Sequence, residues 1–411
     1  MDNDKKKNQK GNRGFVYSRD NMDWKIVRLG DYISIKSGLV YKGSKIGKGS
    51  SILLGMGCVS FKDKFVYSGA RPYDGDDCNK RFLVNSGDIV LATRQQSNNM
   101  PILAMPAIIP DSFKDKRVIF GTNLYKVENR SEISNNFLFL LMKHQHYVNY
   151  IAGVKSGTAV QMVTKKNVED YKFLCPPLKT RNRIENILWS YDTLIENNMK
   201  RIRLLEKMAE NLYKEWFVRF RFPGHENVEM VDGLPKGWKR GSLRNICEFK
   251  RGKNITSGEM IEGAIPVVSA GLEPSGYHNE ANVRGTSVTM SSSGANAGFI
   301  AIHYSDIWAA DCSYIEEAAT PYIYYVYELL NNIRSVINNF QRGAAQPHVY
   351  PKDINRIKLV IPTECIRRIA NKHLEIIHGH IQNLQHQNTL LARQRDLLLP
   401  RLMSGRLEIR C

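Results

Sequence analysis

Two stretches of the chain repeat their hydrophobic residues in alternating steps of four and three. This period places apolar side chains along one seam of a helix, as in a coiled coil. The first seam consists of Ile184, Leu188, Tyr191, Ile195, Asn198, Ile202, Leu205, Ala209, Leu212 and Trp216. The second consists of Ala370, Leu374, Ile377, Ile381, Leu384, Asn388, Leu391, Arg395 and Leu398. The pattern predicts two long helices, and Pro400 is expected to end the second one.

Each seam contains one interior asparagine, Asn198 in the first and Asn388 in the second. A buried Asn at such a position costs stability and fixes the register of a coiled coil. If the helices run antiparallel with Asn198 beside Asn388, Leu188 lies opposite Leu398 and neither helix has a long overhang. The alternative is that each helix packs along its own globular domain.

Short runs rich in β-branched and aromatic residues precede each long helix. Between Gly, Ser and Asn clusters they predict strands at residues 51–54, 88–93, 265–269 and 287–290. Longer apolar runs predict helices near residues 137–142 and 322–330, with Pro321 in the first turn of the second. The fold class is therefore α/β, in the sense of mixed α+β.

The sequence contains an internal duplication. Trp24-Lys25, Leu29 and Lys36-Ser37-Gly38 return 214 residues later as Trp238-Lys239, Leu243 and Lys250-Arg251-Gly252. Ser156-Gly157 returns 186 residues later as Arg342-Gly343, so the first copy is longer by 28 residues. Because a sustained repeat of this kind indicates duplicated structure, we expect two similar globular domains and a pseudo-twofold internal repeat.

The repeat and the seams together predict the domain boundaries. We expect a flexible basic tail at 1–23, globular domains at 24–177 and 238–362, long helices at 178–221 and 363–411, and a linker at 222–237.

Charge points to a polyanionic partner. The chain has 411 residues, a formal net charge of +19 and an ordinary hydrophobic content of 42%, which favour a folded protein that binds nucleic acid. No apolar run approaches the ~18 residues of a membrane span, and residues 1–14 do not resemble a signal peptide. We therefore expect a cytoplasmic protein with no membrane partner. The seven scattered cysteines predict reduced thiols rather than disulfides or a zinc site.

Catalytic motifs are missing from the sequence. It contains no P-loop, no His-Glu-x-x-His and no Asn-Pro-Pro-aromatic motif of an amino-methyltransferase. Pro110-Asp111 and Glu248-Phe249-Lys250 resemble parts of a metal-nuclease pattern, but they lie in different copies. His373, His378, His380 and His386 lack the spacing of a metal site and predict a solvated helix face. We expect no catalytic residue, cofactor or metal in this chain.

Three polar elements suit DNA instead. Cations beside a glycine predict phosphate contacts, because the missing side chain lets the backbone approach closely. An Arg-Gln-Gln segment after a strand predicts base contacts in the major groove, and its counterpart is a serine-rich loop. A basic glycine turn near the last strand of each copy is the third element. The candidates are Lys36, Ser37, Lys42, Lys250, Arg251 and Lys253; Arg94, Gln95, Gln96, Asn98, Ser292, Ser293 and Asn296; and Lys155, Thr158, Arg342 and Gln346. The alternative is that these are ordinary polar surface loops.

The duplicated order of these elements resembles a known family. A Trp-Lys-x-x-x-Leu start, a Lys-x-Gly turn, the strand at 86–90, a glycine turn with Gln, Pro176-Pro177-Leu178 and a long helix together resemble the specificity subunit of type I restriction–modification enzymes. The likeness extends from Trp24 to the C-terminus. The acidic-Gln pair that usually follows Pro-Pro-Leu is absent, and Lys179-Thr180-Arg181 and Glu364-Cys365-Ile366 stand there.

The resemblance implies a non-catalytic DNA-recognition subunit. It implies two target-recognition domains that read a bipartite DNA sequence, separated by an antiparallel pair of helices. It also implies docking of two methyltransferase subunits and, through them, of restriction/translocase subunits, with S-adenosylmethionine, ATP and Mg on those partners. Two other functions remain open: a self-contained methyltransferase or nuclease, and a coiled-coil scaffold that binds DNA without reading its sequence.

Overall fold

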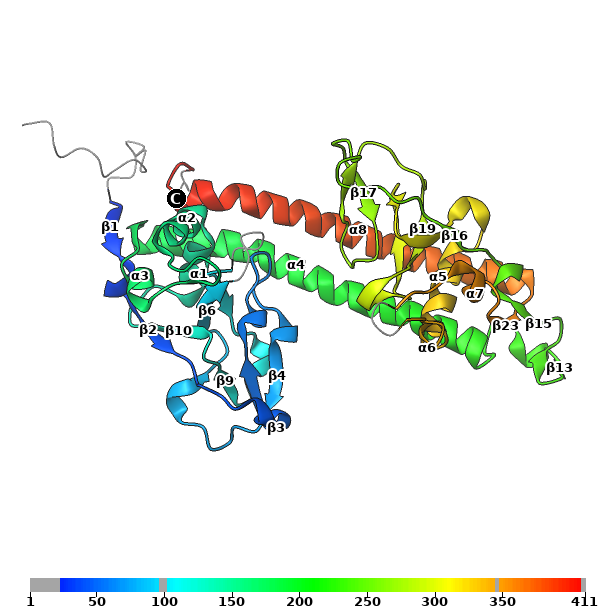
Figure 1. Ribbon diagram of the computed structural model, residues 1–411, viewed down its shortest axis with the longest axis horizontal. Helices are drawn as coiled ribbons and strands as arrows, with labels where there is room; N and C mark the ends of the chain where they lie inside the picture. The colour runs from blue at the N-terminus through cyan, green and yellow to red at the C-terminus, as the bar shows by residue number, and fades with distance from the viewer. Residues whose placement is uncertain (1–22, 96–101, 344–346, 408–411) are drawn as a thin grey trace, which may run out of the picture. The chain divides into compact units, whose positions relative to one another are not determined.

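The computed structural model describes residues 23–95, 102–343 and 347–407. These residues form two compact units, each built from separate parts of the chain. Unit 1 contains the chain up to Leu194 together with the part from Leu390 onward, and unit 2 contains Ile195–Thr389. Figure 1 shows the strands of unit 1 in colours from blue to blue-green and those of unit 2 in colours from green to orange.

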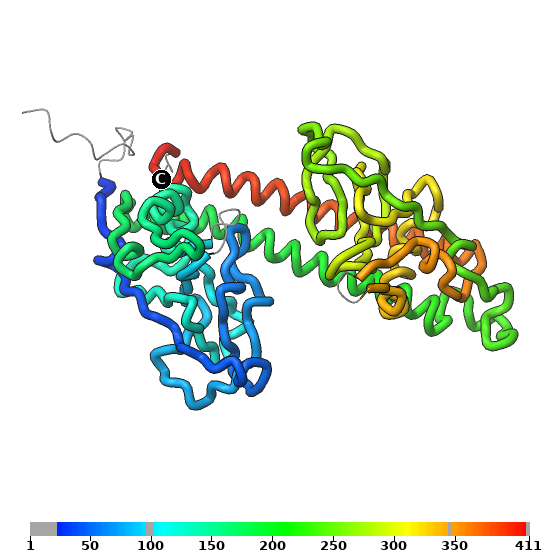
Figure 2. Tube along the Cα trace, in the orientation of Figure 1, coloured from blue at the N-terminus to red at the C-terminus, as the bar shows by residue number. Residues whose placement is uncertain are grey.

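Unit 1 is built on two four-stranded sheets. The first has the order β2 (Ile33–Ser37), β10 (Leu124–Asn129), β6 (Ile89–Ala92) and β8 (Pro106–Ile108), and all its pairs are antiparallel. The second has the order β4 (Ala70–Tyr73), β3 (Ile46–Leu54), β9 (Val118–Phe120) and β5 (Leu83–Val84), in which β3 and β9 are parallel. Strand β1 (Lys25–Arg28) pairs with β12 (Lys172–Cys175), so the chain closes the globular part of unit 1 before it enters the long helix (Figure 2).

Helices cover the first sheet of unit 1. They are α1 (Asn135–Lys143), α2 (Gln145–Val154) and α3 (Lys165–Glu169). Six consecutive residues of α1, from Phe137 to Met142, are buried in one cluster with Ile33 and Ile89 of the sheet. Burial on all sides explains why this helix appears in the sequence as an unbroken apolar run rather than an amphipathic one.

Unit 2 repeats this plan. Its main sheet has the order β16 (Lys250–Arg251), β22 (Cys312–Glu316), β19 (Ser287–Ser291) and β20 (Ile300–His303). Its second sheet has the order β18 (Gly276–His278), β17 (Ile265–Val268) and β21 (Trp308–Ala309). Its small pairs are β13 (Met230–Val231) with β14 (Leu234–Pro235) and β15 (Lys239–Ser242) with β23 (Lys358–Ile361). The helices are α5 (Ile323–Asn332), α6 (Arg334–Asn338) and α7 (Pro351–Ile354).

The order of the strands confirms the predicted duplication. In each main sheet the strand that comes first along the chain lies beside the strand that comes last, and β17 and β21 are parallel as β3 and β9 are. All four predicted strands and both predicted apolar helices are present. The prediction for Pro321 is wrong, since α5 begins at Ile323 and Pro321 precedes the cap residue Tyr322.

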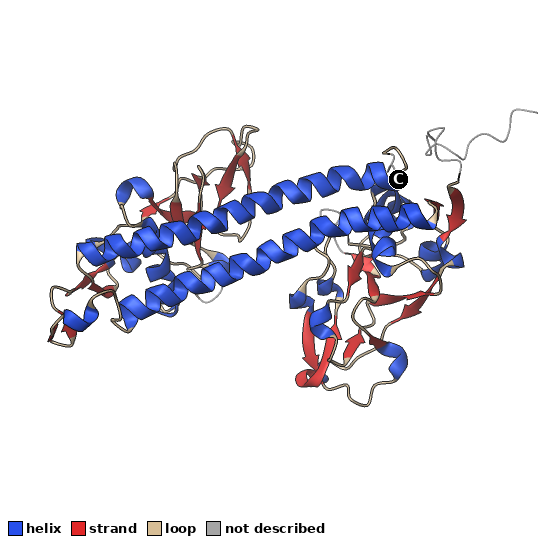
Figure 3. Cartoon of the chain, turned by 180° about the vertical axis from the view of Figure 1, so that it is seen from behind, coloured by secondary structure: helices blue, strands red, loops and turns tan. Residues whose placement is uncertain are grey.

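Two long helices pass through both units and pack against each other within each one. They are α4 (Leu178–Tyr213), which continues as a π-helical turn at Lys214–Val218, and α8 (Glu364–Met403) (Figure 3). In unit 1 the start of α4 (Ile184, Leu188) shares a core cluster with the end of α8 (Leu402). In unit 2 the later part of α4 (Ala209) shares one with the early part of α8 (Leu374). The pairing is therefore antiparallel within each unit, and every seam position is buried or half-buried.

The prediction that Pro400 ends the second long helix is wrong. Helix α8 continues for three more residues, to Met403, and the carbonyl of Pro400 accepts the amide of Ser404. The missing N–H and the ring of Pro400 affect the preceding turn, whereas its own carbonyl still accepts a hydrogen bond, so the helix continues past it.

Asn198 and Asn388, which an antiparallel pairing would place side by side, do not hydrogen-bond to each other. The Asn198 Nδ2 atom instead donates to Gln387 Oε1 at 3.4 Å. The Oδ1 atom of Asn388 is buried without a hydrogen-bond partner. The predicted register is correct to within one residue, and the longer side chain of Gln387 reaches the amide of Asn198 first.

The prediction of a solvated face for all four histidines of α8 is wrong at His378. His373, His380 and His386 are exposed, but His378 is 2% exposed. Its ring stacks on Tyr324, its Nδ1 atom lies 2.8 Å from the Tyr304 hydroxyl, and its Nε2 atom lies 3.4 Å from Glu328. The position is buried because the globular part of unit 2 packs against this side of α8.

Candidate nucleic-acid interface

Lys36 and Lys250 occupy the same place in the two copies. Each lies on the first strand of its main sheet, opposite Lys126 and Tyr314 respectively. Each is exposed and forms an ion pair with a glutamate two residues further along the neighbouring strand. Lys36 Nζ lies 3.4 Å from Glu128 and Lys250 Nζ lies 2.9 Å from Glu316. A phosphate that contacts either lysine must therefore compete with a carboxylate.

The two glutamates are held differently. A hydrogen bond from Ser34 lowers the pKa of Glu128 to about 2, with further contributions from Arg130 and Lys36. On the other copy, the hydrogen bond from Lys250 to Glu316 raises the pKa of the lysine. Lys250 therefore stays charged at neutral pH, and Glu128 has more than one cation beside it.

The glycines next to these lysines have a structural reason of their own. A Cβ atom on Gly38 would lie 2.1 Å from the carbonyl oxygen of Gly121. A Cβ atom on Gly252 would lie 2.4 Å from the carbonyl oxygen of Ala310. Glycine is required because the backbone of the neighbouring segment packs here, and an approaching phosphate is not needed to explain it.

The other candidates of this element are exposed. Ser37 ends β2, Lys42 precedes a short 3-10 turn, and Arg251 ends β16. The carbonyl of Lys253 accepts the indole N–H of Trp308 at 2.9 Å, which places the Lys253 ammonium 5.9 Å from the centre of that ring. These side chains are available to solvent and to a polyanion.

Of the predicted base-reading segment in unit 1, only Arg94 is exposed among the described residues. Arg94 and Gln95 form strand β7. Gln95 is buried, where its Nε2 donates to Gln161 at 2.6 Å and its Oε1 accepts the amides of Ile102 and Leu103. Gln95 therefore has no free polar atom for a base, which corrects the prediction. Gln96 and Asn98 lie outside the described residues.

The serine-rich counterpart in unit 2 also requires correction. Ser292 and Ser293 are buried, and the hydroxyl of Ser293 donates to the carboxylate of Asp311. Asn296 is half-buried, and its Nδ2 donates to the carbonyl of Ala270 at 3.4 Å. These three side chains support the loop from inside, because the turn that contains them packs back onto the sheet.

The structure brings the second and third predicted elements of unit 1 together. Strand β7 pairs with β11 (Gln161–Met162), so that Arg94 lies opposite Met162. Met162 also exchanges two backbone hydrogen bonds with Ser156 on its other side. The turn between them carries the exposed Thr158, and Lys155 donates to Gln161 at 3.0 Å.

The same three-segment arrangement is present in unit 2. Ser293 pairs with His348, and His348 exchanges two backbone hydrogen bonds with Arg342. We call this arrangement the clip: it consists of Ser156, Met162 and Arg94 in unit 1 and of Arg342, His348 and Ser293 in unit 2. Neither Met162 nor His348 is among the predicted contacts, although the offset of 186 residues that aligns Ser156 with Arg342 also aligns them. Gln346 lies outside the described residues.

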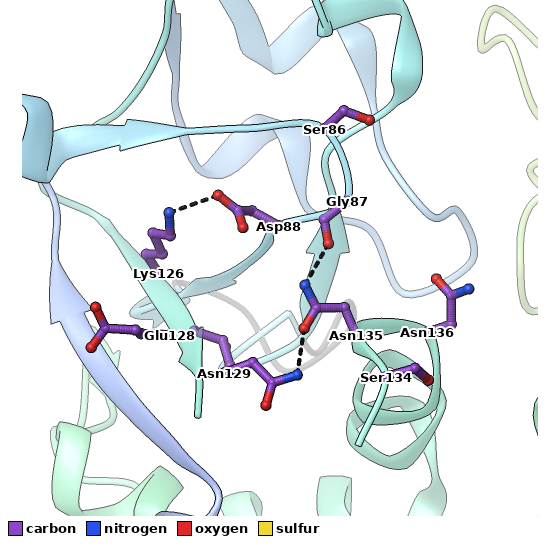
Figure 4. Close-up of a pocket in the computed structure, with 10 residues that line it drawn as sticks. Ser86, Gly87, Asp88, Lys126, Glu128, Asn129, Ser134, Asn135 and Asn136 are labelled. Atoms are coloured by element: carbon purple, nitrogen blue, oxygen red, sulfur yellow. Dashed lines mark hydrogen bonds and ion pairs between the residues drawn. The ribbon is translucent and has the colours of Figure 1, made fainter. Parts of the chain in front are cut away.

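A polar pocket in unit 1 adjoins the candidate Lys36 through the partner of that lysine, Glu128 (Figure 4). It is lined by Ser86, Gly87, Asp88, Lys126, Val127, Glu128, Asn129, Ser134, Asn135 and Asn136. Lys126 and Asp88 point toward each other at 2.6 Å, and Asn129 donates to Asn135, which donates to the carbonyl of Gly87. These polar groups bind one another, so the pocket has a structural role in joining β10 to α1.

The long helices carry exposed apolar side chains. In unit 2, α4 exposes Met199, Leu204 and Met208, and α8 exposes Ile376. In unit 1, the exposed large apolar residues of the two helices are Leu178, Leu194, Leu390 and Leu397. Scattered singly, such side chains are ordinary on a protein surface, whereas a contiguous patch of them marks an interaction site.

The part of the chain that the structure describes contains no group of three or more His, Cys, Asp or Glu side chains arranged to hold a metal ion. None of its helices combines the length and the apolar composition needed to cross a bilayer. The six described cysteines form no disulfide.

Comparison with known proteins identifies one family. Residues 21–207 and 235–391 match the family model described as the type I restriction modification DNA specificity domain. The specificity subunit of type I restriction enzyme MjaIX from Methanocaldococcus jannaschii is 24% identical over 364 residues, which cover 81% of this chain and 80% of that protein. The MjaVIII specificity subunit of the same organism is 25% identical over 246 residues, or 59% of this chain and 53% of that protein.

A solved structure has the same fold. The crystal structure of a type I restriction–modification S subunit from M. genitalium superposes with a TM-score of 0.57 and covers 96% of this chain and 99% of its own. The sequence identity is 18%, so this likeness speaks for the fold.

Proposed function

We propose, on the premise that this chain belongs to the family of type I restriction modification DNA specificity domains, that it directs methylation to a bipartite DNA sequence. The two globular domains each read one half of that sequence, and the bases between the halves are not read. The observation that carries this proposal is the clip, because its backbone is the same in both units while its side chains differ.

The division of labour follows the predicted boundaries. Residues 24–177 and 238–362 are the two target-recognition domains, residues 178–221 and 363–411 are the long helices, residues 222–237 are a linker, and residues 1–23 are a basic tail. The exposed lysines and arginines neutralise phosphates, which supplies affinity but no sequence information. Exposed side chains of the clips contact base edges and supply specificity.

The exposed apolar side chains of the long helices are the docking surface for two methyltransferase subunits. The pseudo-twofold repeat offers two related sites for two copies of the same partner. Restriction/translocase subunits join through the methyltransferases. S-adenosylmethionine, ATP and Mg belong to these partners, and the assembly works in the cytoplasm.

One experiment tests the function. The chain is co-expressed with a methyltransferase subunit of its own operon, and modified bases are mapped across the host genome. We expect one motif of two short halves around an unread spacer. An uninterrupted motif would contradict two-domain reading. Replacing residues 24–177 by the equivalent segment of another family member should change one half of the motif only.

Measurements on the purified chain address the two other functions. The chain alone should neither methylate nor cleave DNA, and either activity would favour a self-contained enzyme. At fixed salt it should prefer the mapped motif over an unrelated duplex of the same length. Equal affinity for both duplexes would favour a scaffold that does not read sequence.

The docking surface has its own test. Leu204 is 71% exposed on α4, and Leu204→Glu should abolish co-purification of the methyltransferase subunit because it places a charge in an apolar contact. Leu272 is 64% exposed in the loop between β17 and β18, and Leu272→Glu is the matched control that should leave the complex intact. Equal loss of the partner in both variants would contradict docking on the helices.

A further inference from the structure

The clip places one residue of each unit at the centre of three neighbouring segments. We propose that these residues, Met162 in unit 1 and His348 in unit 2, are specificity-determining residues that contact base edges of double-stranded DNA. This inference rests on the proposed function and adds two side chains that the sequence patterns did not indicate.

The geometry of unit 1 turns Met162 outward beside Arg94. Residues directly opposite in an antiparallel pair direct their side chains to the same face, so Met162 shares a face with Arg94 and Ser156. Arg94 is exposed and Met162 is 42% exposed, although methionine is ordinarily a core residue. Val160, two residues before Met162, is also exposed.

The underside of this clip is fixed by hydrogen bonds. Gln95 and Gln161 follow and precede the outward residues on their strands, so they point the other way. The Gln95 amide bonds to Gln161 and to two backbone amides, and Lys155 also donates to Gln161. Gln95 and Gln161 are therefore positioning residues, because they fix the strands that carry Arg94 and Met162.

The clip of unit 2 has different chemistry on the same backbone. The central residue is His348, the cation Arg342 stands at the place of Ser156, and Ser293 stands at the place of Arg94. The cation has thus moved from one side of the central residue to the other. The ring of His348 stacks on the exposed Tyr350, with centroids 6.2 Å apart and planes inclined by 18°. Arg342 is exposed and forms an ion pair with Asp353 at 2.9 Å.

These side chains suit different base edges. Arginine donates two hydrogen bonds to guanine, and an apolar side chain contacts the C5-methyl group of thymine. The pair Arg94 and Met162 therefore matches a guanine next to a thymine. His348 has a ring nitrogen that donates and, when neutral, one that accepts, so it reads a polar base edge beside the cation Arg342. The two clips should accordingly select different half-sites.

Substitution of the central residues tests the inference in the complex with the methyltransferase subunit. Met162→Ala should relax one position in the half read by unit 1, with the preference for its base reduced about tenfold or more. The other half and the spacer should be unchanged. His348→Ala should do the converse. Methylation mapping measures both, and competition between cognate and single-substituted duplexes measures the discrimination of the purified complex.

A control and a conservative variant keep the test decisive. Met230 is 53% exposed in β13 and lies in no clip, so Met230→Ala should leave the motif unchanged. If Met162→Ala lost all methylation, Met162→Leu, which keeps the size and apolarity of the side chain, would be compared in the competition assay, and it should retain the motif with weakened discrimination.

The outcomes separate the inference from the function on which it rests. If the wild-type chain directs methylation to a bipartite motif and both alanine variants keep that motif with unchanged discrimination, the inference is overturned and the proposed function stands. If the wild-type chain yields no bipartite motif, the proposed function fails and the inference fails with it.

Discussion

Residue 192 of α4 and residue 378 of α8 are equivalent in the repeat, and both are buried polar groups with different chemistry. Asp192 lies in unit 1, where its carboxylate accepts from Arg395 of α8 and lies 3.7 Å from Lys64. His378 lies in unit 2, where it contacts the Tyr304 hydroxyl and the carboxylate of Glu328. In unit 1 the acid lies on α4 and a cation on α8, whereas in unit 2 the imidazole lies on α8 and the acid on α5.

The difference shows which property the duplication has kept. It has kept the place where a long helix makes a buried polar contact, while the charges of the partners have been reversed. In contrast, the exposed pairs Lys36 with Glu128 and Lys250 with Glu316 have kept both place and chemistry. A buried charge without its partner is costly. Each of these buried polar groups therefore depends on the partners that its own unit supplies.

The largest effect is expected from Asp192→Ala. The substitution leaves the mostly buried guanidinium of Arg395 with only the exposed Asp396 as a partner, which should lower the free energy of unfolding by about 3–5 kcal/mol. Chemical denaturation measures this change. The exposed pair of Glu229 with Lys236 provides the control, and Glu229→Ala should cost less than about 1 kcal/mol. Equal costs for both variants would refute a buried ionic contact.

The corresponding change in unit 2 is His378→Ala. It removes the hydrogen bond with Tyr304, opens a cavity beside Tyr324 and leaves the buried Glu328 without its base. We expect a loss of about 3 kcal/mol. His380, two residues further along α8, is exposed, and His380→Ala should change stability by less than about 0.5 kcal/mol. If the two histidines behaved alike, the burial of His378 would be wrong.

This contact also marks the limit of prediction from sequence. The seams, the duplication and the main strands were predictable, because hydrophobic periods and repeats are local patterns. The burial of His378 was not predictable, because it depends on which face of α8 meets the globular part of unit 2. Nothing in the spacing of the four histidines distinguishes His378 from its exposed neighbours.

The candidate DNA interface was likewise predictable only in part. Sequence located the three polar elements, and the structure brings two of them together in the clip. The sequence does not show which of Arg94 and Gln95 is exposed. Alternate residues of a strand face opposite sides, and β7 has only two residues, too few for a pattern of alternation. Met162 and His348 were not predictable as DNA contacts, because neither a methionine nor a lone histidine is typical of such a contact.

The next largest effect is a loss of folding stability at acidic pH, which we expect in both units. Burial lowers the pKa of His303 in unit 2 to about 4, and burial followed by the nearby His146 lowers the pKa of His144 in unit 1 to about 4. Between pH 6.5 and 4 the unfolded chain binds protons that these folded histidines do not, so stability falls as pH falls through this range. Each histidine should contribute about 3 kcal/mol, fully present above pH 6.5.

The variant His303→Gln tests this pH dependence in unit 2. A glutamine keeps a hydrogen-bonding group for Thr289, which lies 2.9 Å from the imidazole, and has no proton to gain in this range. The free energy of unfolding of the variant should therefore fall less between pH 7.5 and pH 4.5 than that of the wild type. An identical fall would mean that His303 is protonated in the folded chain.

A smaller effect on stability is expected from substitution of the two seam asparagines, both of which lie in unit 2. Asn388→Leu removes a buried oxygen that has no hydrogen-bond partner, so it should stabilise the chain by about 1 kcal/mol. Asn198→Leu loses only the 3.4 Å contact with Gln387, and its cost should be about 0.5 kcal/mol or less. The effects should add in the double variant. A coupling energy above about 1 kcal/mol would show that the two amides do meet.

The smallest effect concerns the exposed pairs that the two units share, and it is measured on DNA binding. Glu316→Gln removes the carboxylate that holds Lys250, whereas Glu128→Gln removes one that holds both Lys36 and Arg130. The freed cations become available to phosphates. The slope of log affinity against log salt should therefore steepen by about one unit for Glu316→Gln and by up to about two for Glu128→Gln.

The lysine variants complete this last test. Lys36→Ala and Lys250→Ala should each make the slope shallower by about one unit and weaken specific and unrelated duplexes equally, because a phosphate contact carries no sequence information. Arg94→Ala should instead weaken the specific duplex more, since Arg94 lies on the clip of unit 1. If the glutamine variants left the slope unchanged, the paired lysines would not face DNA, and the two exposed ion pairs would be contacts that only join neighbouring strands.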